Sequence, residues 1–213
     1  PATPQIYTLS LHDALPILMP PYVAPIQVVI VPIQQQRPEV MAACQRLEAE
    51  LRQMSFRVKI DDSDKSPGWK FAESEIKGIP LRIEIGPRDL EKNECLIVRR
   101  HDGDKQLFKL DRVAGELTGI LRSIHEAMFA KAQENVANNT HRATTYTEFK
   151  KLMDANAGYV KMMWCGDEAC EVKIKEDTAA TARCIPFHQE HLGDICPVCG
   201  QDAKLMVLFA KAY

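Results

Sequence analysis

Two pairs of cysteines near the C-terminal end carry the clearest chemical signal in this sequence. Cys165 and Cys170 are separated by GDEA, and Cys196 and Cys199 form a CxxC followed by Gly200. Four thiolates are the tetrahedral ligand set that structural zinc prefers, and a CxxCG turn can aim backbone N–H groups at the sulfurs. The spacing therefore predicts one zinc ion held by these four cysteines. With every position filled by protein, the metal would stabilise a small domain and leave no site for water.

Other interpretations of these residues stay open. A CxxC can be a redox pair, but that motif normally follows a strand and opens a helix, whereas CPVCGQDAK leads into an apolar strand. Cys184 lies between the two pairs and could compete as a ligand, although its neighbours Ile, Pro and Phe at 185–187 favour a packed strand. His188 and His191 could replace a cysteine, but we expect both to be exposed to solvent.

The composition indicates in which cellular compartment the protein works and limits which classes of partner it can bind. Seven cysteines among 213 residues are too few for a disulfide scaffold, and their odd number leaves one unpaired. The first basic residue is Arg37, and no apolar run approaches the roughly 18 residues of a membrane span. We therefore expect a soluble protein of the reducing cytoplasm, with no membrane partner, in which Cys44 and Cys95 are small core residues. A net charge of −2 restricts any nucleic-acid contact to a local patch.

The elements that must position these residues begin with a βαβ pattern. Residues 26–33, IQVVIVPI, read as a buried strand, and alternation over residues 56–60 predicts a second one. Between them, a helix beginning at Pro38 places apolar residues at three- and four-residue spacing: Val40, Cys44, Leu47, Leu51 and Met54. Strand, helix and strand in this order predict a parallel pair.

A second block continues the sheet. The pattern predicts a short helix over residues 69–77, a stop at Gly78 and a strand over residues 81–85 that points Arg82 and Glu84 away from the isoleucines. Further strands at 95–98 and 106–110 flank the Asp102-Gly103 pair, which is a strong hairpin signal. A long amphipathic helix follows from Val113 past Met128 and ends near the Asn-rich residues 135–140, which suit a domain boundary.

Beyond this boundary the pattern predicts a smaller domain around the cysteines. Helices are expected over residues 146–154 and 171–177, and a strand over 159–164 leads into Cys165. The final apolar strand, LMVLFA, is apolar on both faces and should be buried, ending just short of Tyr213. No GxGxxG, Walker, HExxH or GxSxG motif occurs in the sequence. The residues alone therefore leave a protein-interaction module and a small-ligand domain as alternatives.

Several segments nevertheless resemble a known family: APIQVVIVPI, SPGWKFAESEIKGIPLRIEIGPRDL, TARCIPF, CPVCG and the ending LFAKAY. Together they are similar to the C-terminal half of prolyl-tRNA synthetases that carry a zinc-binding domain after their anticodon-binding domain. The resemblance extends from Met19 to Tyr213, and GxPLRxExGPRD with a terminal Tyr is a specific combination. It implies an α/β fold: a class II synthetase anticodon-binding domain, with a mixed sheet flanked by helices, and then a small α+β zinc-binding domain.

The resemblance also implies how the chain is divided and what it does. It places a non-family leader, disordered or artefactual, at residues 1–18, the anticodon-binding domain at 19–135, a linker at 136–145 and the zinc-binding domain at 146–213. The parent enzyme would be a proline-tRNA ligase, a homodimer that uses ATP and Mg in a catalytic domain toward which Tyr213 would reach. Because the class II catalytic motifs are missing from this sequence, we expect the chain alone to be inactive.

The resemblance assigns anticodon contacts to Phe71, Glu75, Arg82, Arg88 and Asp89. Proline anticodons end in two guanines, whose edges offer N–H donors and a carbonyl acceptor, so a reader needs carboxylates, arginines and a ring for stacking. These five residues supply that set. The simpler alternatives are that Phe71 is a core residue and that Arg82 and Glu84 form a surface ion pair. The competing function is a zinc-stabilised protein-interaction module that binds no tRNA.

Overall fold

The computed structural model describes residues 18–211. The expected leader, apart from its last residue, and Tyr213 lie outside the described residues. The chain forms two compact units, divided after Ala130 within helix α5 (Val113–Asn138). Helix α5 and strand β6 (Thr140–Arg142) occupy much of 136–145, where we expected a linker, and the domain bounds stay a prediction. No helix among the described residues is both long and apolar enough to span a membrane.

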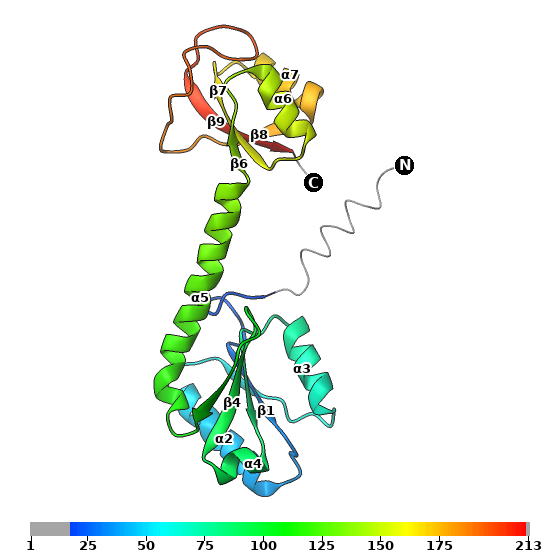
Figure 1. Cartoon of the computed structure of the whole chain (residues 1–213), viewed down its shortest axis with the longest axis vertical. Helices are drawn as coiled ribbons and strands as arrows, with labels where there is room; N and C mark the ends of the chain where they lie inside the picture. The colour runs from blue at the N-terminus through cyan, green and yellow to red at the C-terminus, as the bar shows by residue number, and fades with distance from the viewer. Residues whose placement is uncertain (1–17, 212–213) are drawn as a thin grey trace. The chain divides into compact units, whose positions relative to one another are not determined.

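The first unit is built on a five-stranded mixed sheet in the order β2-β1-β3-β4-β5 (Figure 1). Its strands are β1 (Val28–Pro32), β2 (Val58–Ile60), β3 (Leu81–Ile85), β4 (Glu94–Arg99) and β5 (Lys105–Lys109). Strand β1 pairs in parallel with β2 and with β3, which confirms the predicted parallel pair. Strands β3, β4 and β5 form antiparallel pairs, and the Asp102-Gly103 hairpin is confirmed.

Helices cover both faces of this sheet, so β1 is buried on both sides and reads as a continuous apolar run. On one face, α2 (Pro38–Gln53) and α5 pack against residues such as Val28, Ile30 and Ile83. On the other, α3 (Pro67–Ile76) contributes Phe71 to a smaller cluster around Val29 and Val31. Met54, the last position of the predicted apolar stripe, is exposed because α2 ends at Gln53.

The second unit has a four-stranded sheet in the order β6-β7-β9-β8. Its further elements are α6 (Tyr146–Asp154), β7 (Tyr159–Trp164), α7 (Glu168–Thr178), β8 (Ala180–Cys184) and β9 (Leu205–Lys211). Strand β9 lies between β7 and β8 and is largely buried, which confirms the expected buried final strand. The core contains Phe149 of α6 and Phe209 of β9, whose ring centroids are 5.5 Å apart in an edge-to-face arrangement.

The segment between β8 and the CxxC, residues 185–195, is attached to the sheet by the side chains of Gln189 and Glu190. The Gln189 amide accepts the backbone N–H of Met206 at 2.7 Å, continuing the pairing along β9. Glu190 accepts hydrogen bonds from Arg142, at 2.8 Å, and from Lys161, and these partners hold the pKa of Glu190 below its usual range. This segment is therefore tied to three strands of the sheet without belonging to it.

Candidate metal centre and nucleic-acid interface

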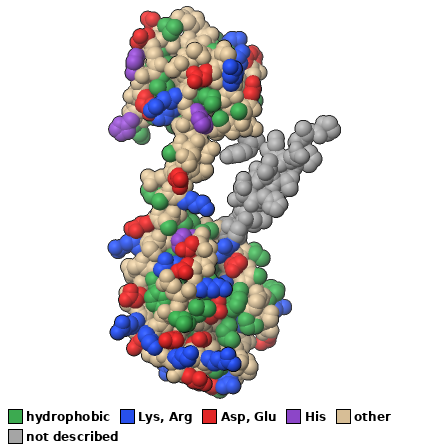
Figure 2. Space-filling model, in the orientation of Figure 1, with side chains coloured by type: hydrophobic (Ala, Val, Ile, Leu, Met, Phe, Trp, Pro, Cys, Tyr) green, Lys and Arg blue, Asp and Glu red, His purple; other side chains and the backbone are tan. Residues whose placement is uncertain are grey.

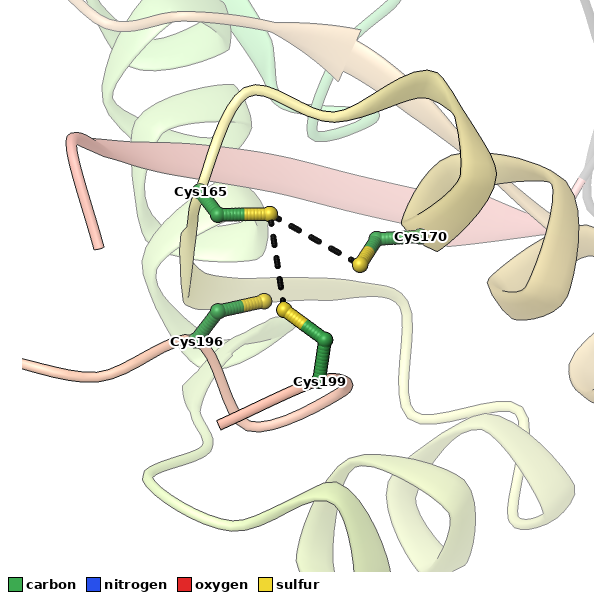
Figure 3. Close-up of side chains that lie close together, drawn as sticks. All are labelled: Cys165, Cys170, Cys196 and Cys199. Atoms are coloured by element: carbon green, nitrogen blue, oxygen red, sulfur yellow. Dashed lines mark hydrogen bonds between the residues drawn. The ribbon is translucent and has the colours of Figure 1, made fainter. Parts of the chain in front are cut away.

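The four predicted cysteines converge in the second unit (Figure 3). Their sulfur atoms all lie within 4.8 Å of one another, with 3.6 Å between Cys165 and Cys170 and 3.7 Å between Cys199 and Cys165. A tetrahedral zinc ion with bonds of about 2.3 Å requires sulfurs about 3.8 Å apart. The side chains therefore fit a single metal ion held by four sulfurs.

Local structure on each side brings the sulfurs to one point. Cys165 follows β7, and the next residue, Gly166, turns the chain with a φ of +89°. Asp167 then caps α7 by accepting the N–H of Ala169 at 2.9 Å, which fixes Cys170 in the first turn of that helix. The chain between Cys165 and Cys170 is thus a tight turn closed by a helix cap.

The second pair lies in a knuckle of the kind that binds zinc in many proteins. The N–H of Gly200, at a φ of +75°, donates to the carbonyl of Cys196 at 2.8 Å, and the N–H of Cys196 donates to Gln201 at 2.7 Å. The CxxC lies between Asp194 and Gln201 in a segment with no helix, so it does not open a helix as a thioredoxin-like redox pair would. This placement favours a metal knuckle.

The electrostatics of the cluster show why a cation would stabilise it. Burial alone would raise the pKa of Cys196, but hydrogen bonds from the backbone of Cys199, Val198 and Cys165 and from the Cys199 side chain together outweigh it and lower the pKa of that thiol. Burial raises the pKa of Cys165 and of Cys170. A divalent cation coordinated by these sulfurs would supply the missing positive charge and keep the thiols deprotonated. The chemistry of the donor set thus agrees with the geometry.

The competing ligands lie elsewhere on the surface. Cys184, His188 and His191 are all exposed, as expected for the histidines. The prediction of a packed strand around Cys184 is wrong, because Ile185 is 53% exposed and Phe187 fully exposed. Strand β8 ends at Cys184, so these apolar side chains follow the sheet instead of lying in it.

Three of the five expected anticodon-binding residues meet in the first unit. The guanidinium carbon of Arg82 lies 4.1 Å from the centroid of the Phe71 ring. Its Nε donates to Glu84 at 2.9 Å and its Nη1 donates to Glu75 at 3.4 Å. Arg82 is only 7% exposed, so this is not a surface ion pair. Phe71 also packs on the cluster around Val29, so it serves the core as well as the arginine.

The remaining two residues lie at the other end of β3. There, Pro87–Glu91 form the short helix α4 directly after the strand. Asp89 caps this helix, since its carboxylate accepts the N–H of Gly86 at 2.8 Å, while Arg88 is exposed. Three residues of extended strand separate Arg82 from the end of β3, a distance on the order of 10 Å. The five residues thus form two groups along one strand.

Sequence reasoning missed the basic residues beside the first group. A pocket of about 120 Å³ is lined by Glu75 and Arg82 and also by Arg99, Arg100 and Lys105 from the β4–β5 hairpin. The only local signal was the run RRHDGDK, in which cations flank a turn. Its position beside Arg82 depends on the pairing of β3 with β4, which spacing along the chain does not reveal.

Comparison with known proteins agrees with this arrangement. Residues 27–120 match the anticodon binding domain family, and residues 146–213 match the family described as prolyl-tRNA synthetase, C-terminal. The chain is 47% identical over 197 residues to proline–tRNA ligase 2 of Bacillus thuringiensis subsp. konkukian and to proline–tRNA ligase of Lachnospira eligens. Each alignment covers 92% of this chain and 41% of the relative, so the chain spans less than half the length of these proteins. The chain therefore carries an anticodon binding domain followed by a domain of the family described as prolyl-tRNA synthetase, C-terminal.

Proposed function

We propose that the first unit recognises the anticodon loop of proline tRNA, and that the chain acts as the C-terminal part of an enzyme that attaches proline to this tRNA. The observation that carries the proposal is the Phe71–Glu75–Arg82 cluster within the segment that matches the anticodon binding domain family. The similar proteins from Bacillus thuringiensis and Lachnospira eligens are named as proline–tRNA ligases.

The cluster suits a guanine better than other bases. Guanine presents two neighbouring N–H donor groups and a carbonyl acceptor on its Watson–Crick edge. Glu75, whose side chain is 45% exposed, can accept from the donors, and Arg82 can donate to the carbonyl through the N–H groups not used by Glu75 and Glu84. Both carboxylates and the Phe71 ring fix the guanidinium in place before RNA binds, which reduces the entropy lost on binding.

The role that we propose for Phe71 differs from the base stacking that the sequence led us to expect. The Phe71 ring already carries the Arg82 guanidinium over one face, so we assign to Phe71 the role of orienting Arg82. Guanidinium planes can themselves stack on bases. Arg88 and Asp89, at the far end of β3, would contact a second nucleotide, with Asp89 limited by its role as a helix cap.

In the second unit, we propose zinc as the metal held by Cys165, Cys170, Cys196 and Cys199. Zinc would cross-link and stabilise this small domain. It would take no part in a chemical reaction. ATP, Mg, a homodimeric assembly and a cytoplasmic location belong to the proposal for the whole enzyme.

An electrophoretic shift assay tests the proposal. The chain should bind proline tRNA and should bind less well when either anticodon guanine is replaced. Arg88→Ala should weaken binding by about 1–3 kcal/mol and relax discrimination at one base if Arg88 makes a guanine contact. Absence of tRNA binding at moderate salt would instead favour a protein-interaction module.

The distribution of charge on the surface bears on how strongly RNA would bind non-specifically in such an assay (Figure 2). On the face in view, acidic and basic side chains are interspersed over the first unit, without an extended basic surface. Non-specific attraction to RNA should therefore be weak, and local contacts should dominate.

A further inference from the structure

The pocket beside Arg82 has a charge that the protein itself does not balance. It lies between the end of α3 and the β4–β5 hairpin, and Arg82, Arg99, Arg100 and Lys105 line it together with a single carboxylate, Glu75. Within the described residues 18–211, no carboxylate lies within 4.0 Å of the charged nitrogens of Arg99, Arg100 or Lys105. The pocket is therefore electropositive.

The nearest carboxylates in the sequence are engaged elsewhere. Asp102 lies 3.2 Å from Nε2 of His101 and also accepts the backbone N–H of Asp104 at 3.0 Å. Asp104 accepts a hydrogen bond from the Gln106 amide at 2.6 Å. The hairpin thus directs its carboxylates to their immediate neighbours and leaves its cations available.

One of the arginines has a donor without an acceptor. Nε of Arg100 is buried and has no hydrogen-bond partner among the residues that the structure describes. A buried charged donor without a partner costs free energy, so an acceptor that reached this nitrogen would be stabilised. This observation is independent of the charge count and also calls for an anionic acceptor.

The backbone holds these cations in place before any ligand arrives. Arg82, Val98 and Lys105 are cross-strand neighbours along β3, β4 and β5. The N–H of Arg99 donates to Asp104 at 2.9 Å, and the N–H of Arg100 donates to Pro80 at 3.0 Å. These backbone hydrogen bonds to the carbonyls of Asp104 and Pro80 fix the points from which the cationic side chains extend, and arginine and lysine side chains bind phosphate oxygens well.

We propose that this pocket binds one phosphodiester group of the RNA strand whose guanine is read by Glu75 and Arg82. The inference rests on the proposed anticodon function and extends it to the RNA backbone. A pocket of about 120 Å³ has room for a phosphate group. Arg100 provides a planar donor group, and Lys105, which lies on the same face of the sheet as Arg82, provides a second cation.

The test is the salt dependence of tRNA binding by the whole chain. Each phosphate contact to a single strand contributes about 0.7 to the slope of log K against log salt. Arg100→Gln and Lys105→Gln should each lower this slope by about that amount, so that binding weakens about 2.6-fold less between 50 and 200 mM salt. Both variants should weaken proline tRNA and its guanine-substituted forms by the same factor. Arg46→Gln, an exposed change of equal charge on α2, should leave the slope unchanged.

The outcomes separate this inference from the function on which it rests. A wild-type chain that ignores the anticodon overturns the proposed function. A wild-type chain that discriminates, while both variants keep the full slope, overturns only the phosphate site. Loss of discrimination at one base with an unchanged slope would assign the pocket to a base and also overturn it. Lys105 is exposed, so Lys105→Gln remains informative if Arg100→Gln lowers the melting temperature.

Discussion

Replacing Cys199 by Ser should unfold the second unit while the first stays folded. Cys199 is the one exposed member of the four cysteines, so a serine hydroxyl at this position meets solvent and adds no buried polar group. The change in stability therefore reports the lost metal ligand. Cys184→Ser makes the same chemical change at another exposed position in the same unit and serves as the matched control.

The expected size of the effect follows from the small core of this unit. Its main cluster contains nine buried residues: Ala143, Phe149, Met153, Val160, Met162, Ile174, Ala180, Val207 and Phe209. Apart from the end of helix α5, the described part of this unit is residues 139–211, and a single core in a domain of up to about 70–80 residues rarely supplies more than about 3–5 kcal/mol. Structural zinc contributes about 10–16 kcal/mol in zinc-finger peptides, so losing the ion should exceed what the core can offset.

Tryptophan fluorescence can follow the two units separately. Trp164 packs beside the cysteine cluster, whereas Trp69 lies half-exposed on α3 in the first unit. In a Trp69→Phe background, Cys199→Ser should give the emission of an unfolded Trp164 without denaturant, and elemental analysis should find no zinc. The Cys184→Ser chain should keep one zinc and a cooperative transition. If Cys199→Ser matched this control in both measurements, the metal would not be the source of the unit's stability.

Three further changes give sharp expectations. Arg82→Lys keeps the charge but loses the planar group over the aromatic ring, so guanine discrimination should fall by about 1–3 kcal/mol with an unchanged salt slope; an altered slope would contradict this. The pKa of Glu190 is lowered in the folded protein, so its carboxylate stabilises the fold at pH values above its ordinary pKa of 4.5. This stabilisation is lost as the pH falls through the lower folded-state pKa. Glu190→Gln should therefore reduce the pH dependence of the melting temperature below pH 4.5, and an unchanged dependence would contradict this role. Gly158→Ala should cost about 1–3 kcal/mol in denaturant unfolding of the second unit, because φ is +96° and a Cβ would lie 2.6 Å from the Asn139 carbonyl oxygen; unchanged unfolding would refute that strain.

Features that depend on local pattern were predictable from the sequence. Strand β7 occupies the predicted residues 159–164, and the strands on either side of Asp102-Gly103 form the expected hairpin. The convergence of the two cysteine pairs was also predictable, because a tetrahedral ion needs four ligands and each pair supplies only two. In these cases the sequence spacing itself carries the constraint.

Structural features that leave no apolar pattern in the sequence were harder to predict. The end of helix α5 near residues 135–140 was predicted, but strand β6 was not, because its three residues carry no apolar pattern and are defined by their pairing with β7. The separation of Arg88 from Arg82 and the basic pocket both follow from strand register and strand length. Such distances between side chains arise from tertiary pairing, which a family motif read along the chain does not display.

The contact between Glu75 and an anticodon guanine is the centre of this account, and a double-mutant cycle with inosine tests it most directly. Inosine lacks the exocyclic amino group of guanine, so it removes one donor that the Glu75 carboxylate would accept. Binding of the wild-type chain and of Glu75→Gln is measured with anticodon stem-loops that carry guanine or inosine at each of the two positions. We expect a coupling energy of about 0.5–3 kcal/mol at one position. Additive effects at both positions would contradict it.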